Sequence, residues 1–136
     1  MNVFFDVDGT IIESYGLRLR PLVREVFEQF RVDGHVLYIW SGVGLRWHEI
    51  DQHDLRPLIE TCYWKPRYDH HARLAELGVE IFPEFVIDDH AEVVSAFGGI
   101  IVDAFDYYNA RDREMERVYR AICARAEQPP APGIGS

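Results

Sequence analysis

The sequence predicts one α/β domain built around a mostly parallel sheet of five strands. Short apolar segments of strand length alternate along the chain with longer segments whose apolar residues recur at helical spacing. This alternation is typical of folds in which a helix connects each strand to the next parallel strand. With 136 residues, the chain is long enough for one such domain and too short for two of ordinary size.

The five expected strands are short and almost wholly apolar, as in a parallel sheet whose two faces are both buried. β-branched and aromatic residues dominate them, which favours strands over helices at these positions. The expected strands are Asn2–Phe5, His35–Trp40, Thr61–Trp64, Phe85–Ile87 and Ile100–Val102.

The segment between the first two strands predicts a helix that begins at Pro21, carries Val26, Phe27 and Phe30 on its apolar face, and ends near Asp33. Residues 127–136 are rich in proline and glycine and predict a disordered tail, so the domain covers residues 1–126. The other expected helices are Leu45–Asp54, Arg67–Leu77, His90–Phe97 and Arg111–Ala126.

Composition argues against two classes of partner. The formal net charge of −9 disfavours broad attraction to nucleic acid or to an anionic membrane. No apolar run approaches the ~20 residues that a membrane-spanning helix needs. No signal-like segment precedes the first strand, and the two cysteines, Cys62 and Cys123, predict free thiols, with a disulfide between them as the alternative. We therefore expect a cytoplasmic protein.

Polar side chains suited to chemistry follow four of the expected strands. Asp6 and Asp8 follow the first, Ser41 the second, Lys65 the third, and the acidic pair Asp88–Asp89 the fourth. The carboxyl ends of parallel strands meet at one edge of a sheet, where ligands bind in such folds. The sequence therefore predicts a site that combines four carboxylates, one ammonium group and one hydroxyl.

Four carboxylates at one edge need a cation besides a single lysine. Two carboxylates about 4 Å apart repel by roughly 4 kcal/mol at an effective dielectric constant of about 20. Oxygen ligands favour a hard divalent ion, and Mg²⁺ is commonly held by a few carboxylates, water and a substrate phosphate. We therefore expect a Mg²⁺ site.

Four segments resemble, in order, the motifs of the haloacid dehalogenase-like (HAD) superfamily of phosphohydrolases. The segments are FFDVDGTII, VLYIWSG, YWKP and FVIDD, and the resemblance spans Asn2 to about Asp103. The superfamily's motifs are a strand before D-x-D-G-T, a strand ending in Ser or Thr, a Lys often followed by Pro, and a strand ending in paired acids. The resemblance implies a three-layer Rossmann-like domain with phosphatase activity.

The resemblance also implies the catalytic roles. Asp6 is the expected nucleophile, which forms an aspartyl-phosphate and so divides one difficult step into two. Asp8 is the expected general acid, which protonates the leaving oxygen and then activates water as a base. Ser41 is expected to donate a hydrogen bond to a phosphoryl oxygen, and Lys65 is expected to neutralise phosphate charge.

The remaining motif residues are expected to shape the phosphate and metal sites. Gly9 allows a tight turn around the phosphate, the hydroxyl of Thr10 can hold that turn, and Gly42 follows the phosphate-binding serine. By the resemblance, Asp8 contributes its main-chain carbonyl to the metal. The expected Mg²⁺ ligands are Asp6, Asp8, Asp88 and Asp89.

Members of the superfamily often carry a cap domain that covers the site, and this chain resembles a capless member. Residues 9–30 have room for a small flap and one helix, and residues 41–65 for one helix and a loop. An open site suits either a macromolecular substrate that covers it or a small one covered by another subunit of a homo-oligomer. We favour a small phosphorylated metabolite, such as a sugar or nucleotide phosphate.

Each motif alone has an ordinary explanation as a helix cap, turn or surface residue, and only their joint order favours a phosphatase. A noncatalytic phosphate-binding or regulatory module on the same fold is the alternative. A receiver-type signalling domain fits less well, because its phosphorylated Asp follows the third strand, where this chain has Lys65. The residues near the motifs that can either pack or contact substrate are Trp40, Trp64, His90, Tyr107 and Tyr108.

Overall fold

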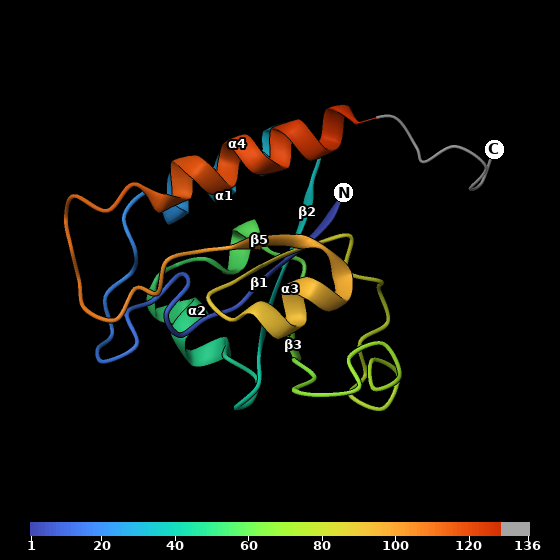
Figure 1. The fold of residues 1–136 in the computed structure, drawn as a ribbon. Helices are drawn as coiled ribbons and strands as arrows, with labels where there is room; N and C mark the ends of the chain where they lie inside the picture. The colour runs from blue at the N-terminus through green and yellow to red at the C-terminus, as the bar shows by residue number, and fades with distance from the viewer. Residues whose placement is uncertain (129–136) are drawn as a thin grey trace.

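The structure is a computed structural model that describes residues 1–128. Within these residues five parallel strands form one sheet in the order β3-β2-β1-β4-β5, which confirms the predicted α/β fold (Figure 1). Two predicted strands, β2 and β5, are displaced by one residue at both ends, and β4 extends one residue further than predicted. The strands are β1 Asn2–Phe5, β2 Val36–Ser41, β3 Thr61–Trp64, β4 Phe85–Asp88 and β5 Gly99–Ile101.

The strand order puts β1 at the centre of the sheet. The chain leaves β1 toward β2 and β3 on one side, and then crosses to β4 and β5 on the other. In open parallel sheets, ligands bind at the carboxyl ends of the strands where the order reverses in this way. The structure therefore directs attention to the residues that follow β1 and its neighbours β2 and β4.

Side chains alternate between the two faces of the sheet, and both faces are buried. Val3 and Phe5 of β1 pack in one core with α1 (Val23–Val32) and α4 (Glu114–Glu127). Phe4 packs on the opposite face with α3 (Ala91–Phe97). Figure 1 shows α1 and α4 together on one side of the sheet and α3 on the other. This double burial explains why the strands are apolar throughout.

Four of the five predicted helices are present, each shorter than predicted, and the fifth is absent from the described residues. Helix α1 begins at Val23 rather than Pro21, because Leu22 has a left-handed φ of 71°. Helix α4 begins at Glu114 rather than Arg111, because Asp112 is engaged by Arg20. The remaining short helices are α2 Trp47–Gln52 and the 3₁₀ helix η1 Arg56–Leu58.

Residues 67–77 form turns, so the predicted helix Arg67–Leu77 is wrong. Asp69 has a left-handed φ of 44°, which interrupts a helix near its expected start. The ring of His71 lies 4.5 Å from that of Phe97, and its Nε2 lies 2.6 Å from the carbonyl oxygen of Ala96. Contacts with the end of α3 therefore hold this segment in a non-helical path.

Arg20 ties together the segments that follow β1 and β5. Its guanidinium donates to both carboxylate oxygens of Asp112 at 2.8 and 3.0 Å, and to the carbonyls of Thr10 and Asp103 at 3.1 and 2.8 Å. It also lies 5.0 Å from the centre of the Phe105 ring. The side chain is only 1% exposed, so these contacts satisfy a buried cation.

The segment predicted as a disordered tail, residues 127–136, lies outside the described residues apart from its first two. Both cysteines are free thiols, as predicted. None of the helices within residues 1–128 has the length and apolar character required to cross a membrane.

Candidate active site

Three predicted site residues meet at the carboxyl ends of β1, β3 and β4. Lys65, directly after β3, donates from Nζ to Oδ1 of Asp6 and to Oδ2 of Asp88, at 2.8 Å in each case. The backbone N–H of Asp6 donates to the carbonyl of Ile87 at 3.0 Å, which joins the ends of β1 and β4. The parallel sheet thus brings residues that are distant in sequence onto one ammonium group.

The charges of this cluster are incompletely compensated. Asp6 is 5% exposed, and Asp88 is fully buried. Burial raises the pKa of Asp6 to about 7 against the opposing effect of Lys65, and repulsion from Asp88 adds to the rise. Burial likewise raises the pKa of Asp88, again against Lys65. Burial disfavours the ammonium group of Lys65, but Asp6 and Asp88 together raise its pKa.

The turn after β1 holds the first motif in a fixed shape. The carbonyl of Val7 accepts hydrogen bonds from the N–H groups of residues 10–12, at 3.0 to 3.1 Å. Gly9 has a φ of 79°, and a Cβ there would lie 2.6 Å from Oδ2 of Asp89. The left-handed backbone therefore favours glycine at this position, and a Cβ would also displace the Asp89 carboxylate.

Thr10 positions carboxylates and does not line the pocket described below. Its side chain is fully buried. Its hydroxyl lies 3.1 Å from Oδ2 of Asp6 and 3.4 Å from Oδ1 of Asp89, so it can donate to either carboxylate. The hydroxyl of this motif residue thus orients the predicted nucleophile.

Asp8 is held in an ion pair that we did not predict from the sequence. Its two carboxylate oxygens accept hydrogen bonds from the guanidinium of Arg46 at 2.7 and 2.9 Å. Nη1 of Arg46 also lies 3.2 Å from Oγ of Ser41, and its Nε lies 3.1 Å from Oε1 of Glu49. Arg46 therefore connects the predicted general acid to the predicted phosphate-binding hydroxyl.

We did not predict Arg46 as a site residue because it lies within the range of an expected helix. That helix was expected over Leu45–Asp54, whereas α2 begins at Trp47 and leaves Arg46 in the loop after β2. The signal that could have found it is charge. Four predicted acids faced a single predicted lysine, and Arg46 follows the second motif by only a few residues.

The acids at this edge fit a hard divalent cation. Asp88, Asp89 and His90 each offer one ligand atom, and these atoms lie within 4.8 Å of one another. Nδ1 of His90 lies 3.1 Å from Oδ1 of Asp89, whose negative charge raises the pKa of His90 against the effect of burial. Arg46 pairs with Asp8, and Lys65 pairs with both Asp6 and Asp88, whereas Asp89 has no arginine or lysine partner among the described residues. The four predicted acids thus outnumber the two cations paired with them. Carboxylates with excess negative charge could therefore hold a divalent cation at this edge.

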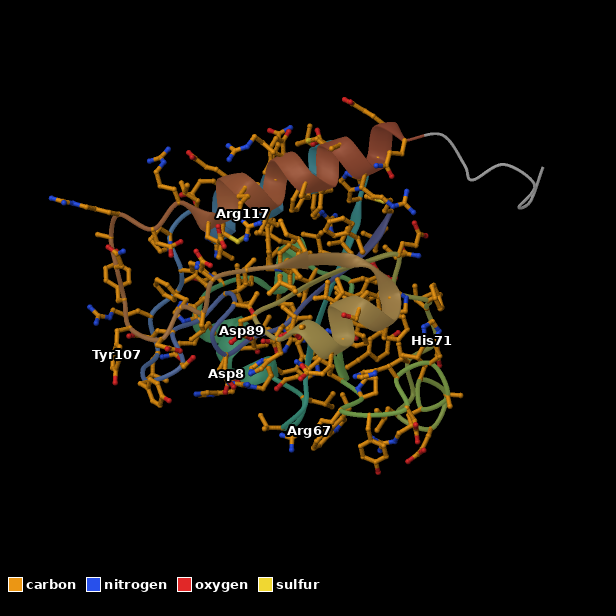
Figure 2. The ribbon with its side chains drawn as sticks, viewed as in Figure 1. Asp8, Arg67, His71, Asp89, Tyr107 and Arg117 are labelled. Carbon is orange, nitrogen blue, oxygen red and sulfur yellow. The ribbon has the colours of Figure 1, made fainter. Side chains whose placement is uncertain are left out.

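A pocket of about 420 Å³ opens beside these groups and is lined by five of the predicted residues, Asp6, Asp8, Ser41, Gly42 and Lys65. Figure 2 marks Asp8, Asp89 and Arg67 in this part of the molecule. The pocket also contains polar side chains that we did not predict as site residues. These are Arg67, His70 and Glu92.

Of the five residues that the sequence left open between a packing role and substrate contact, one lines the pocket and four do not. His90 lines the pocket. Trp40 is fully buried in the core that contains Phe4, and Trp64 is exposed beside Gly44. The ring of Tyr107 stacks on that of Tyr15 at 5.3 Å, on the loop beyond β5 (Figure 2). Among the described residues, the pocket lining does not include Trp40, Trp64, Tyr107 or Tyr108.

No protein-family model matches the chain, and no curated protein matches it significantly. The chemistry of the site therefore rests on its own geometry.

Proposed function

We propose that the protein is a Mg²⁺-dependent phosphomonoester hydrolase of the HAD-like superfamily, with a three-layer Rossmann-like domain and no cap domain. One observation carries this function: Lys65, which follows β3, binds both Asp6 after β1 and Asp88 at the end of β4, at 2.8 Å in each case. Asp8 and Ser41 line the pocket that Asp6 and Lys65 also line, which supports the proposal.

The residues of the chain divide hydrolysis into two steps. An oxygen of Asp6 attacks phosphorus, the ester P–O bond breaks, and Asp8 gives its proton to the leaving oxygen. Asp8 then takes a proton from water, whose oxygen attacks the aspartyl-phosphate and releases inorganic phosphate and free Asp6. Lys65 and Ser41 stabilise the charge on the phosphoryl oxygens in both steps.

The metal would be held by Asp6, Asp88, Asp89 and the main-chain carbonyl of Asp8. When bound there, Mg²⁺ would neutralise phosphate charge in addition to that balanced by Lys65. The excess of carboxylates over paired cations at the site supports this assignment.

A small phosphorylated substrate suits the pocket better than a macromolecule. A volume of about 420 Å³ falls in the range of small-molecule sites. We propose that a second subunit of a homo-oligomer covers the open side during turnover. The two free thiols support a reducing, cytoplasmic location.

A noncatalytic phosphate-binding module is the second candidate, and the Asp8–Arg46 pair favours it. A carboxylate bound on both oxygens by a guanidinium does not hold the proton that a general acid must give up. In the hydrolase, the arrival of substrate must release Asp8 from this pair. Phosphate release distinguishes the two functions, because a binding module forms no product.

The test is release of phosphate from p-nitrophenyl phosphate in the presence of Mg²⁺ or of EDTA. We expect turnover with Mg²⁺ only, and loss of turnover to background in Asp6→Asn, whose amide is a poor nucleophile. Asp33→Asn, an exposed acid at the end of α1, is the matched control and should keep full activity. Undiminished turnover in Asp6→Asn would contradict the mechanism.

A further inference from the structure

Arg67 is a cation in the pocket wall without an acidic partner among residues 1–128. By contrast, Arg46 and Lys65 at the same site both bind carboxylates. The Arg67 side chain packs directly over Gly42. A Cβ at position 42 would lie only 2.7 Å from Nε of Arg67. A guanidinium held against a pocket wall in this way is available to bind an anion.

The pocket is larger than the phosphoryl group requires. Asp6 and Ser41 are buried, whereas Arg67 is exposed, so the pocket extends from the attacking carboxylate to a solvent-facing guanidinium. With the phosphoryl group beside Asp6 and Ser41, the leaving group occupies the remaining space. That space is bordered by the polar side chains Arg67, His70 and Glu92.

The charges in this remaining space limit what the leaving group can carry. Arg67 is positive and Glu92 is negative, and both line the pocket. Any anionic group there would be attracted by Arg67 and repelled by Glu92 in proportion to its charge. A group with one negative charge and planar oxygens matches the guanidinium better, because two parallel hydrogen bonds can form.

We propose that Arg67 binds a carboxylate on the leaving group, so that the substrate is a small phosphomonoester bearing one additional carboxylate. This inference rests on the proposed function of the site. It makes Arg67 a specificity-determining residue that distinguishes substrates by their leaving group.

Two phosphate esters of equal length provide the test. In 3-phosphoglycerate a carboxylate replaces the terminal hydroxymethyl group of glycerol 3-phosphate. We expect the wild-type protein to give a higher kcat/KM for 3-phosphoglycerate. The ratio of the two kcat/KM values should fall about tenfold or more in Arg67→Met and less in Arg67→Lys, which keeps the charge but loses the fork of donors. Arg31→Met, an exposed arginine of α1, is the matched control and should keep the wild-type ratio.

Two kinetic outcomes would overturn the inference. One is a wild-type kcat/KM for 3-phosphoglycerate that is no higher than that for glycerol 3-phosphate. The other is an equal loss on both substrates in Arg67→Met, which would mean that the guanidinium binds the phosphoryl group instead.

A binding measurement separates failure of the inference from failure of the proposed function. If the wild-type protein hydrolyses neither ester, calorimetric titration with each ester in the presence of Mg²⁺ decides. Tighter binding of 3-phosphoglycerate that is lost in Arg67→Met would support the subsite, although the protein is then no hydrolase. Equal affinity for the two esters, or no binding of either, would overturn the subsite.

Discussion

At the residue scale, the hydrogen bonds of Asp8 define a test of its role in proton transfer. Asp8→Asn keeps the shape of the side chain and one acceptor for Arg46, but it cannot transfer a proton. We expect kcat for an alkyl phosphate to fall about 10²-fold or more, as is typical for loss of a general acid. The loss should be smaller for p-nitrophenyl phosphate, because its leaving group departs without a proton. Equal effects on the two esters would remove Asp8 from the protonation step.

Arg46 offers a second test at this scale. Its Nη1 lies 3.2 Å from Oγ of Ser41, so a phosphate bound by Ser41 would compete with Asp8 for the same guanidinium. We expect Arg46→Met to raise KM about tenfold or more, as for loss of a charged hydrogen bond, and Arg46→Lys to raise it less. Steady-state kinetics separate KM from kcat. An unchanged KM together with a lower melting temperature would show that Arg46 is only structural.

At the scale of elements, Arg20 joins the turn after β1 to the segment before α4. The guanidinium is buried and binds Asp112 and two carbonyls. Arg20→Met removes the cation beside Asp112, which keeps only the N–H of Glu114 as a donor within the described part of the chain, and it removes the side-chain donor of both carbonyls. We expect the free energy of unfolding, measured by urea denaturation, to fall by about 3–5 kcal/mol, as for removal of one partner of a buried ion pair.

The control for Arg20 is Arg56, which forms a bidentate ion pair with Asp51 on the surface. Arg56→Met should change the urea midpoint much less, because solvent screens exposed pairs. Similar losses in the two variants would mean that burial of Arg20 contributes little.

The elements also show which features of the sequence were predictive. The five strands were found because apolar residues facing two cores leave little ambiguity. The helix over Arg67–Leu77 was wrong because Asp69 adopts a left-handed φ and His71 packs on Phe97, contacts that no local pattern records.

The candidate site was predictable where a residue ends a strand and not where it lies in a loop. Asp6, Ser41, Lys65 and Asp88 meet because parallel strands end at one edge. Arg46 reaches the site from a loop after β2, and no periodic pattern marks loop residues.

At the scale of the whole molecule, the excess negative charge at this edge predicts that Mg²⁺ stabilises the fold. An ion that binds only the folded state adds about 2.7 kcal/mol to the free energy of unfolding at about 100 times its Kd. We expect thermal melts in MgCl₂ to lie above those in EDTA, with NaCl at matched ionic strength as the control. Asp88→Asn should lose most of this shift, and equal melting temperatures of the wild type in MgCl₂ and NaCl would contradict a metal site.

The central position of β1 has a consequence for how the chain folds during synthesis. Of the five strands, β1 is synthesised before the others. It pairs on one side with β2, but its other edge stays unpaired until β4, which begins at Phe85, has been made. Until then the N–H of Asp6 lacks its partner, the carbonyl of Ile87. Pairing between distant segments forms slowly, so nascent chains that end before Phe85 should expose an open strand edge and recruit chaperones.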